Sequence, residues 1–322
     1  MIVDLHSHYF PPSATGPGSP VSSDPAAAGE VVLHVSGHRV RVPEALLDAG
    51  QQVADAKRQG LDRRILLAPP FTVLYELPPD AGVDWSRRVN DGMAAAMHAH
   101  PDHLIGFAVV PLQAGGDVAA AELEHAVRGL GLAGVEVLTS VAGAPLDTPD
   151  LEPFWAAAAD LGVPVFIHPH FVSGADRMSR FHLRNLVGNP TETALTGAQL
   201  LFGGLLDRHP GVTVVLAHGG GALPHLVGRL EHGYRHRAEF DATPGGPREG
   251  LRRFHYDSVV FDPAVLRHVG EIVGFDRLVV GSDYPFDMAD EDPVAFLASA
   301  DLSGPVTKAI LHAADRVLPG VN

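Results

Sequence analysis

Histidine and aspartate side chains stand at the ends of four short apolar runs in this sequence. His6 and His8 follow the first run, His168 and His218 end the next two, and Asp283 follows the last. In an extended chain, residues two apart point to the same side about 7 Å apart, so the imidazoles of His6 and His8 can reach one ion. Imidazole nitrogens and carboxylate oxygens are ligands of zinc and of other divalent ions. The residue types therefore predict metal chemistry.

Each of these residues also has an ordinary structural explanation. A His-x-His pair arises often by chance in a chain with 19 histidines, His168 could be a satisfied strand-end residue before a proline, and Asp283 could cap a turn. The glycines at 219–221 could cradle a phosphate, but the Gly-x-Gly-x-x-Gly and Walker spacings are absent.

The common position of these residues at strand ends decides between the explanations. If the apolar runs are parallel strands of one barrel, all of these residues lie on the face where barrels build their active sites. We therefore expect His6, His8, His168 and Asp283 to bind one divalent ion. His218 then stays free as a base beside it.

Eight β-rich apolar runs alternate with amphipathic or alanine-rich segments, which is typical of repeated β-α units and a parallel sheet. The runs are 2–5, 64–68, 104–109, 134–138, 164–168, 212–217, 254–258 and 277–281. Helices are expected near 44–59, 85–100, 117–130, 150–161, 190–207, 222–237, 263–274 and 293–317. Eight pairs favour closure into a TIM (β/α)8 barrel. Alternation alone leaves a doubly wound open sheet as the alternative.

The segment 9–43 breaks the alternation with many Pro, Ser and Gly residues. It is interpreted as a long insertion loop after the first strand, on the catalytic face, where long loops are usually functional or mobile. A second irregular region, 171–189, follows the fifth strand on the same face. The chain is expected to form a single domain over 1–322.

The composition excludes several partners. A net charge of -15 argues against nucleic acid or an anionic membrane surface as a partner. The sequence has no cysteine, which excludes disulfides, thiolate nucleophiles and cysteine-based zinc sites. No basic region followed by an apolar stretch opens the chain, and no segment has the apolar length of a membrane span, so a cytoplasmic protein is expected.

Taken in order, these residues resemble the amidohydrolase superfamily, and within it the branch of aminocarboxymuconate semialdehyde and γ-resorcylate decarboxylases. The resemblance extends over nearly the whole chain and includes the segments 190–193, 217–222, 227–229 and 281–286. It implies that His6, His8, His168 and Asp283 are the metal ligands. It also implies that His218 is the catalytic histidine and that Asp283 shares in the proton transfer.

The resemblance further implies a carboxy-lyase, a non-oxidative decarboxylase that releases CO2 from a small conjugated or aromatic carboxylic acid. Binuclear members of the superfamily carry a carboxylated lysine at the end of the fourth strand, and neither Lys57 nor Lys308 lies near residue 138, so a single ion is expected. Zn²⁺ is the first choice and Mn²⁺ the alternative. A metal-dependent hydrolase or hydratase is the alternative function, because the same metal hydroxide could attack an ester, lactone or amide or add to a double bond. A metal-free binding protein is a third.

Substrate contacts are carried over from the same resemblance. Arg41 matches an arginine that binds a substrate carboxylate, with Arg39 as the alternative because the insertion shifts the alignment. Arg237 matches a second such arginine that enters from the partner subunit, which together with the alanine-rich helices implies a homodimer. His170 stands near the position of a family tryptophan and is interpreted as a substrate contact. A surface position is the alternative for His170 and for each arginine.

Overall fold

The computed structural model describes residues 1–16, 18–27, 29–240 and 245–319. Its centre is an eight-stranded parallel sheet, whose strands are β1 (Val3–Asp4), β5 (Arg63–Leu66), β6 (Leu104–Val109), β7 (Gly134–Leu138), β8 (Pro164–His168), β9 (Thr213–Leu216), β10 (His255–Asp257) and β11 (Leu278–Val279). Hydrogen-bonded neighbours follow one another in sequence order, which differs from the reversed order of a doubly wound sheet.

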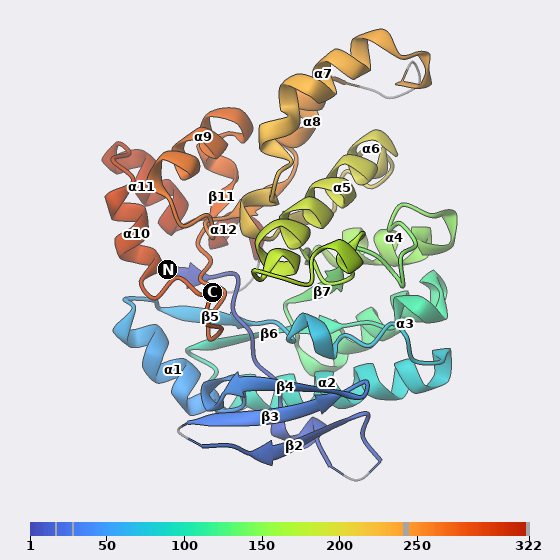
Figure 1. Cartoon of the computed structure of the whole chain (residues 1–322), viewed down its shortest axis with the longest axis vertical. Helices are drawn as coiled ribbons and strands as arrows, with labels where there is room; N and C mark the ends of the chain where they lie inside the picture. Colours follow the sequence, from blue (N-terminus) through green and yellow to red (C-terminus); the bar gives the residue numbers. More distant parts are fainter. Residues whose placement is uncertain (17, 28, 241–244, 320–322) are drawn as a thin grey trace.

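The first and last strands of this sheet also meet. Leu5 donates its backbone N–H to the carbonyl oxygen of Val280 (2.8 Å), and Ser7 forms a parallel bridge with Tyr284. The predicted TIM barrel is therefore confirmed (Figure 1).

Helices surround the strands, and several begin with a capping side chain. Asp48, Asp262 and Asp292 accept backbone N–H groups at the starts of α1, α9 and α10. None of the helices in the described ranges is long and apolar enough to cross a bilayer. Their bounds are α1 (Ala49–Arg58), α2 (Pro79–Ala99), α3 (Gly116–Glu124), α4 (Glu152–Leu161), α5 (Asn189–Phe202), α6 (Leu205–Arg208), α7 (Val227–His236), α8 (Pro247–Leu251), α9 (Pro263–Val273), α10 (Pro293–Ser299), α11 (Gly304–Leu311) and α12 (Ala314–Val317).

Several helix predictions need correction. The helix expected over 190–207 is two helices, α5 and α6, and the helix expected over 44–59 begins at Ala49. The helix expected from residue 85 begins six residues earlier, at Pro79, because proline is favourable in a first helical turn, where its missing N–H has no partner to lose. The single helix expected over 293–317 is three helices, α10 to α12. Gly304 and Pro305 begin the second of them, and a proline cannot continue a preceding helix.

Apolar side chains fill both sides of the sheet. Every residue of β6, β7 and β8 is buried, as expected for parallel strands covered on both faces. One cluster of buried residues fills the barrel interior and includes Leu5, Ile65, Phe107, Phe166, Val215 and Val279. The larger cluster lies between the strands and the helices. This two-sided packing holds the C-terminal strand ends in a rigid ring.

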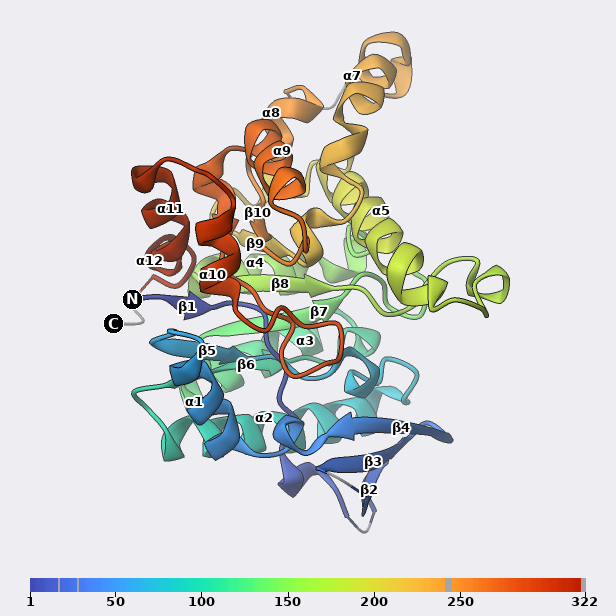
Figure 2. The ribbon, with the colours of Figure 1, turned by 60° about the vertical axis from the view of Figure 1, so that its left-hand side comes forward.

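The segment between β1 and α1 differs from the irregular loop that its composition suggested. It contains a three-stranded antiparallel sheet of β2 (Val21–Pro25), β3 (Glu30–Val35) and β4 (His38–Pro43), at the bottom of Figures 1 and 2. Ser36 and Gly37 join β3 to β4 with positive φ angles, as a tight hairpin turn requires. The valine-rich runs of β3 and β4 explain the sheet. Residues 17 and 28 of this segment lie outside the described residues.

Candidate metal centre

The C-terminal ends of three barrel strands bring the four predicted ligands together. His6 and His8 lie two and four residues after the end of β1, His168 is the last residue of β8, and Asp283 lies four residues after the end of β11. One donor atom from each residue lies within 4.8 Å of the others, and all four residues are buried. His8 Nε2 is 3.1 Å from Asp283 Oδ1 and 3.2 Å from His6 Nε2. Three imidazoles and one carboxylate are therefore close enough to share one ion.

Two of the imidazoles carry their proton on Nδ1, the ring nitrogen that is not the donor atom facing the cluster. His8 Nδ1 donates to the carbonyl oxygen of Ala68 (3.2 Å), and His168 Nδ1 donates to that of Pro169 (2.9 Å). Because a carbonyl oxygen only accepts, each Nε2 keeps its lone pair. His168 Nε2 is buried without a hydrogen-bond partner in the described ranges, and burial holds the pKa of His168 well below its usual value. A divalent ion would satisfy this nitrogen, so the residues fit a metal.

Asp257, the last residue of β10, accepts hydrogen bonds from residues that form the site, and it was not predicted from the sequence. Its Oδ2 accepts from His6 Nδ1 (2.6 Å) and from the backbone N–H of His218 (2.8 Å). Its Oδ1 accepts from the N–H groups of Gly219 (2.8 Å) and Val259 (3.0 Å). The same signal could have found it, because it is an acid at the end of a predicted strand. Asp257 fixes the ring of His6 and the turn that carries His218.

His218 lies beside the cluster, outside the set of four close donors. Its Nε2 is 3.5 Å from Asp283 Oδ2, and its Nδ1 is buried with no hydrogen bond in the described part of the chain. Its backbone has a φ of 56°, which is unusual for a residue with a side chain. The glycines that follow serve this turn: a Cβ on Gly221, at φ 59°, would lie 2.2 Å from the oxygen of Pro190. The lack of a Cβ at these glycines lets the turn pack closely against neighbouring residues such as Pro190. This packing role explains the glycines without a bound phosphate.

The carboxylate of Asp283 is strongly anionic. Burial raises its pKa, but the neighbouring imidazoles of His6, His218 and His8 outweigh this effect and hold the pKa well below its usual value. For His6 the opposing effects are burial, which lowers the pKa, and the carboxylates of Asp283 and Asp257, which raise it to about 9. The centre thus contains a firm negative charge and an imidazole that keeps its proton until a cation replaces it.

A cavity of about 420 Å³ opens next to the cluster and contains two of the predicted substrate residues. His170 and Arg41 line it together with His168 and His218. Arg41 on β4 is 64% exposed, and its Nη1 donates to Glu30 Oε2 (3.0 Å), so it is already paired within the insertion. Arg39 is not among the residues that line this cavity.

Two further arginines differ in their position relative to this cavity. Arg184, in the irregular region before α5, lines the same cavity and was not singled out from the sequence, where only the region was noted. Arg237 is exposed where α7 ends, and α7 projects from the barrel (Figure 1). Within one chain, Arg237 is not among the residues that line the cavity.

The chain is similar to known decarboxylases. A 2-amino-3-carboxymuconate-6-semialdehyde decarboxylase of Dictyostelium discoideum is 31% identical over 315 residues, covering 95% of this chain and 88% of the relative. A γ-resorcylate decarboxylase of Rhodococcus jostii (strain RHA1) is 33% identical over 229 residues, covering 65% of this chain and 68% of the relative. Among solved structures, the 5-carboxyvanillate decarboxylase of Novosphingobium aromaticivorans DSM 12444, complexed with manganese and 4-hydroxy-3-methoxy-5-nitrobenzoic acid, has a TM-score of 0.79. It is 26% identical and is matched over 85% of this chain and 81% of its own.

The family itself follows from a match over almost the full length. The amidohydrolase family model matches residues 3–319, from the first strand to the last helix. That span includes all the residues that form the four-donor cluster and the neighbouring histidine. This chain therefore belongs to the amidohydrolase family.

Proposed function

We propose that this chain is a metal-dependent non-oxidative decarboxylase of a small conjugated or aromatic carboxylic acid. The observation that carries the proposal is His218, a histidine outside the four-donor cluster whose Nε2 lies 3.5 Å from the Asp283 carboxylate. A metal-dependent decarboxylase uses an ion that polarises a substrate oxygen and a proton donor for the carbon that loses CO2, and these residues would hold the ion and supply the proton. The similarity to decarboxylases over 95% of the chain supports the same reaction.

The metal ligands in this proposal are His6, His8, His168 and Asp283. Zn²⁺ is the first candidate because three imidazoles and one carboxylate suit it, and Mn²⁺ is the alternative. The ion would act as a Lewis acid that polarises a substrate oxygen. The chain's own contribution is the orientation of the donors, through the Asp257, Ala68 and Pro169 hydrogen bonds.

In the reaction, the bond between the carboxylate carbon and the neighbouring substrate carbon breaks, and its electron pair remains on that neighbouring carbon. CO2 leaves, and the carbon takes up one proton. In this proposal His218 delivers the proton, since an imidazole exchanges protons near neutral pH. Asp283 lies next to His218 Nε2 and shares in the transfer by holding the charged imidazole.

The substrate contacts are proposed from the lining of the cavity and from the resemblance to known decarboxylases. His170 and Arg41 line the cavity beside the cluster, and Arg184 adds a second cation to its wall. The partner subunit's Arg237 completes the set if the protein is a homodimer. The homodimer, the cytoplasmic location and the single domain over 1–322 stay predictions from the sequence.

Product analysis tests the function. Purified protein loaded with Zn²⁺ or Mn²⁺ is incubated with 2,6-dihydroxybenzoate and with 2-amino-3-carboxymuconate 6-semialdehyde, and CO2 is measured together with the remaining organic product. Equimolar CO2 and decarboxylated product support the proposal. Hydrolysis of a lactone or ester panel without any CO2 from the acids would replace it with the hydrolase. Removal of the ion by a chelator should abolish turnover, and its return should restore it.

A further inference from the structure

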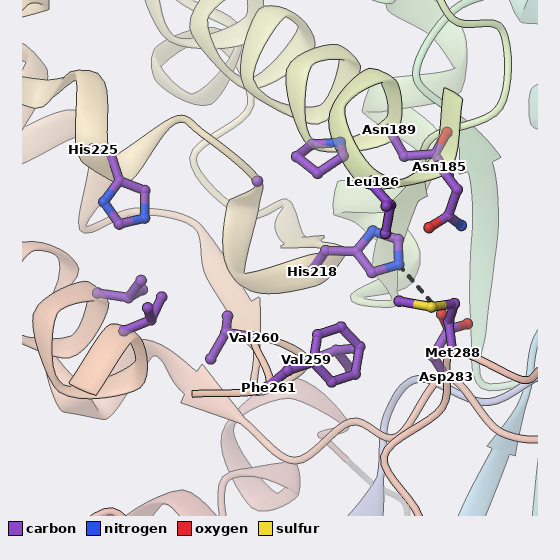
Figure 3. Close-up of a pocket in the computed structure, with 14 residues that line it drawn as sticks. Asn185, Leu186, Asn189, His218, His225, Val259, Val260, Phe261, Asp283 and Met288 are labelled. Carbon is purple, nitrogen blue, oxygen red and sulfur yellow. Dashed lines mark ion pairs between the residues drawn. The ribbon is translucent and has the colours of Figure 1, made fainter. Parts of the chain in front are cut away.

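Two cavities meet at His218, and in the described residues only one of them is lined by arginines. The first, of about 420 Å³, is the cavity that contains His170 and Arg184. The second, of about 240 Å³, extends from His218 and Asp283 to α9 and is shown in Figure 3. We call them the polar chamber and the apolar chamber. Five residues line both: Asn185, Asn189, His218, Asp283 and Met288.

Arg184 is the cation in the polar chamber that is left without an acidic partner. Its only hydrogen bond within the described ranges is a long one of 3.5 Å, from Nη2 to the carbonyl oxygen of His170. Arg41 in the same chamber is paired with Glu30 instead. The positive charge of Arg184 is close enough to contribute, after burial, to lowering the pKa of His170 to about 4. Arg184 is exposed to solvent at the wall of this cavity, and its guanidinium is free to bind a carboxylate through two hydrogen bonds. The carboxylates of Asp283 and Asp287 line the same cavity.

The apolar chamber differs in its charged lining residues. Val259, Val260 and Phe261 line it opposite Leu186 (Figure 3), and Val265 and Val269 of α9 line it as well. None of its lining residues within the described ranges is an arginine or lysine. Its volume exceeds the ~150 Å³ of an engineered apolar cavity that accommodates benzene. The space therefore suits an uncharged hydrocarbon group.

The polar amides at the junction support one ligand that spans both chambers. Asn185 and Asn189 line both cavities on the side of α5, and Asn185 lies near His218 and Met288 in Figure 3. An acid that entered only the polar chamber would leave the apolar walls in contact with water. A substrate that fills both would bury them while its reacting carbon stays beside His218.

We infer that the substrate is an amphipathic acid whose carboxylate binds Arg184 in the polar chamber and whose apolar substituent fills the apolar chamber. The inference rests on the proposed function, since it places the reacting carbon between the two ends. For a 2-hydroxybenzoate, the substituent would be an alkyl group on the ring. Arg184 and Val265 are then residues that determine specificity, one for each end.

Binding of a graded series tests the apolar end. Salicylate, 6-methylsalicylate and 2-hydroxy-6-propylbenzoate are titrated into the metal-loaded protein by calorimetry, and CO2 release is measured in parallel. Each buried carbon should tighten binding about fourfold, so the dissociation constant should fall roughly tenfold or more from the methyl to the propyl compound. Val265→Phe, which fills the chamber from α9, should remove this gain. Val118→Phe on α3, at a valine that is 38% exposed, is the matched control and should keep it.

Arginine substitution tests the other end. Arg184→Gln should weaken the binding of every acid in the series by roughly tenfold or more and raise KM more than it lowers kcat, while Arg184→Lys recovers part of the loss. Arg180→Gln is the matched control, because Arg180 lies four residues earlier and stacks on Phe181 at 4.7 Å. Metal content should stay the same in these three variants.

The outcomes separate this inference from the proposed function. Binding that is insensitive to alkyl length, or weakened by it, overturns the amphipathic substrate even if CO2 is released. Unchanged binding in Arg184→Gln overturns the anion contact. Graded binding without CO2 from any acid upholds the two-chamber site and contradicts the decarboxylase.

Discussion

The Asp257→Asn substitution tests how the metal centre is organised. The Asp257 carboxylate accepts four hydrogen bonds, two on each oxygen, at 2.6–3.0 Å. In asparagine one of these oxygens becomes an NH2 group, which donates hydrogen bonds and cannot accept them. Whichever way the amide turns, two of the four N–H donors therefore face this NH2 group and lose their acceptor. Each buried donor left unpaired costs about 1–3 kcal/mol, which gives about 2–6 kcal/mol of lost folding free energy. If the amide faces His6, that imidazole also loses the acceptor that orients it.

The effect on the metal follows from the same geometry. Loss of an outer hydrogen-bond partner typically lowers metal affinity by about 10- to 100-fold. Metal affinity is measured by competition with a chelator, and stability by thermal unfolding of the metal-free protein. The matched control is Asp48→Asn at the start of α1, because asparagine caps a helix as well as aspartate does. Unchanged affinity and an unchanged melting temperature in Asp257→Asn would refute the organising role.

Three further predictions concern neighbouring groups. His218→Ala should lower kcat by about 10²- to 10⁴-fold while the metal stays bound, whereas His168→Ala should lose the metal. Metal analysis and an activity assay check both variants. Full activity in His218→Ala would show that His218 is not the proton donor. The His6 pKa of about 9 in the folded, metal-free protein exceeds its ordinary 6.5, so metal binding releases a proton from it, and metal affinity should rise with pH up to about 9 and then level. Because the folded-state pKa of His6 is raised, its protonation stabilises the metal-free protein. This contribution to the free energy of unfolding is complete below pH 6.5 and is lost as the pH rises toward 9. A free energy of unfolding that stays constant over this range would contradict the prediction. Gly221→Ala should lower the melting temperature, because its Cβ meets a carbonyl oxygen at 2.2 Å, whereas Gly228→Ala in α7 meets nothing and should not.

Much of the barrel could be predicted because its signals are local. Strands of a parallel sheet are buried on both faces, so they stand out as continuous apolar runs, and the expected run 134–138 is strand β7 without a shift. The site followed because a side chain at a strand end lies on the catalytic face wherever its strand stands in the sequence. His168 was placed in this way, at the last residue of β8.

Other features depend on the neighbours that the fold supplies. The three-stranded sheet over 21–43 was hidden by proline and glycine, because its stability comes from pairing between strands and from burial of side chains such as Leu33. The partner of Arg41 is a residue eleven positions away across a hairpin, which only the strand register reveals.

The sequence by itself determined the chemistry that is available: three imidazoles and a carboxylate at strand ends, with His218 in addition and no thiol. Only the tertiary structure decided how that chemistry is arranged. It gave Asp257 its four donors, left Arg184 without an acid in the described part of the chain, and brought two cavities together at His218. The physical reason is that hydrogen bonds, ion pairs and cavities depend on distances between residues far apart in the chain, whereas residue type and strand period are properties of the chain alone.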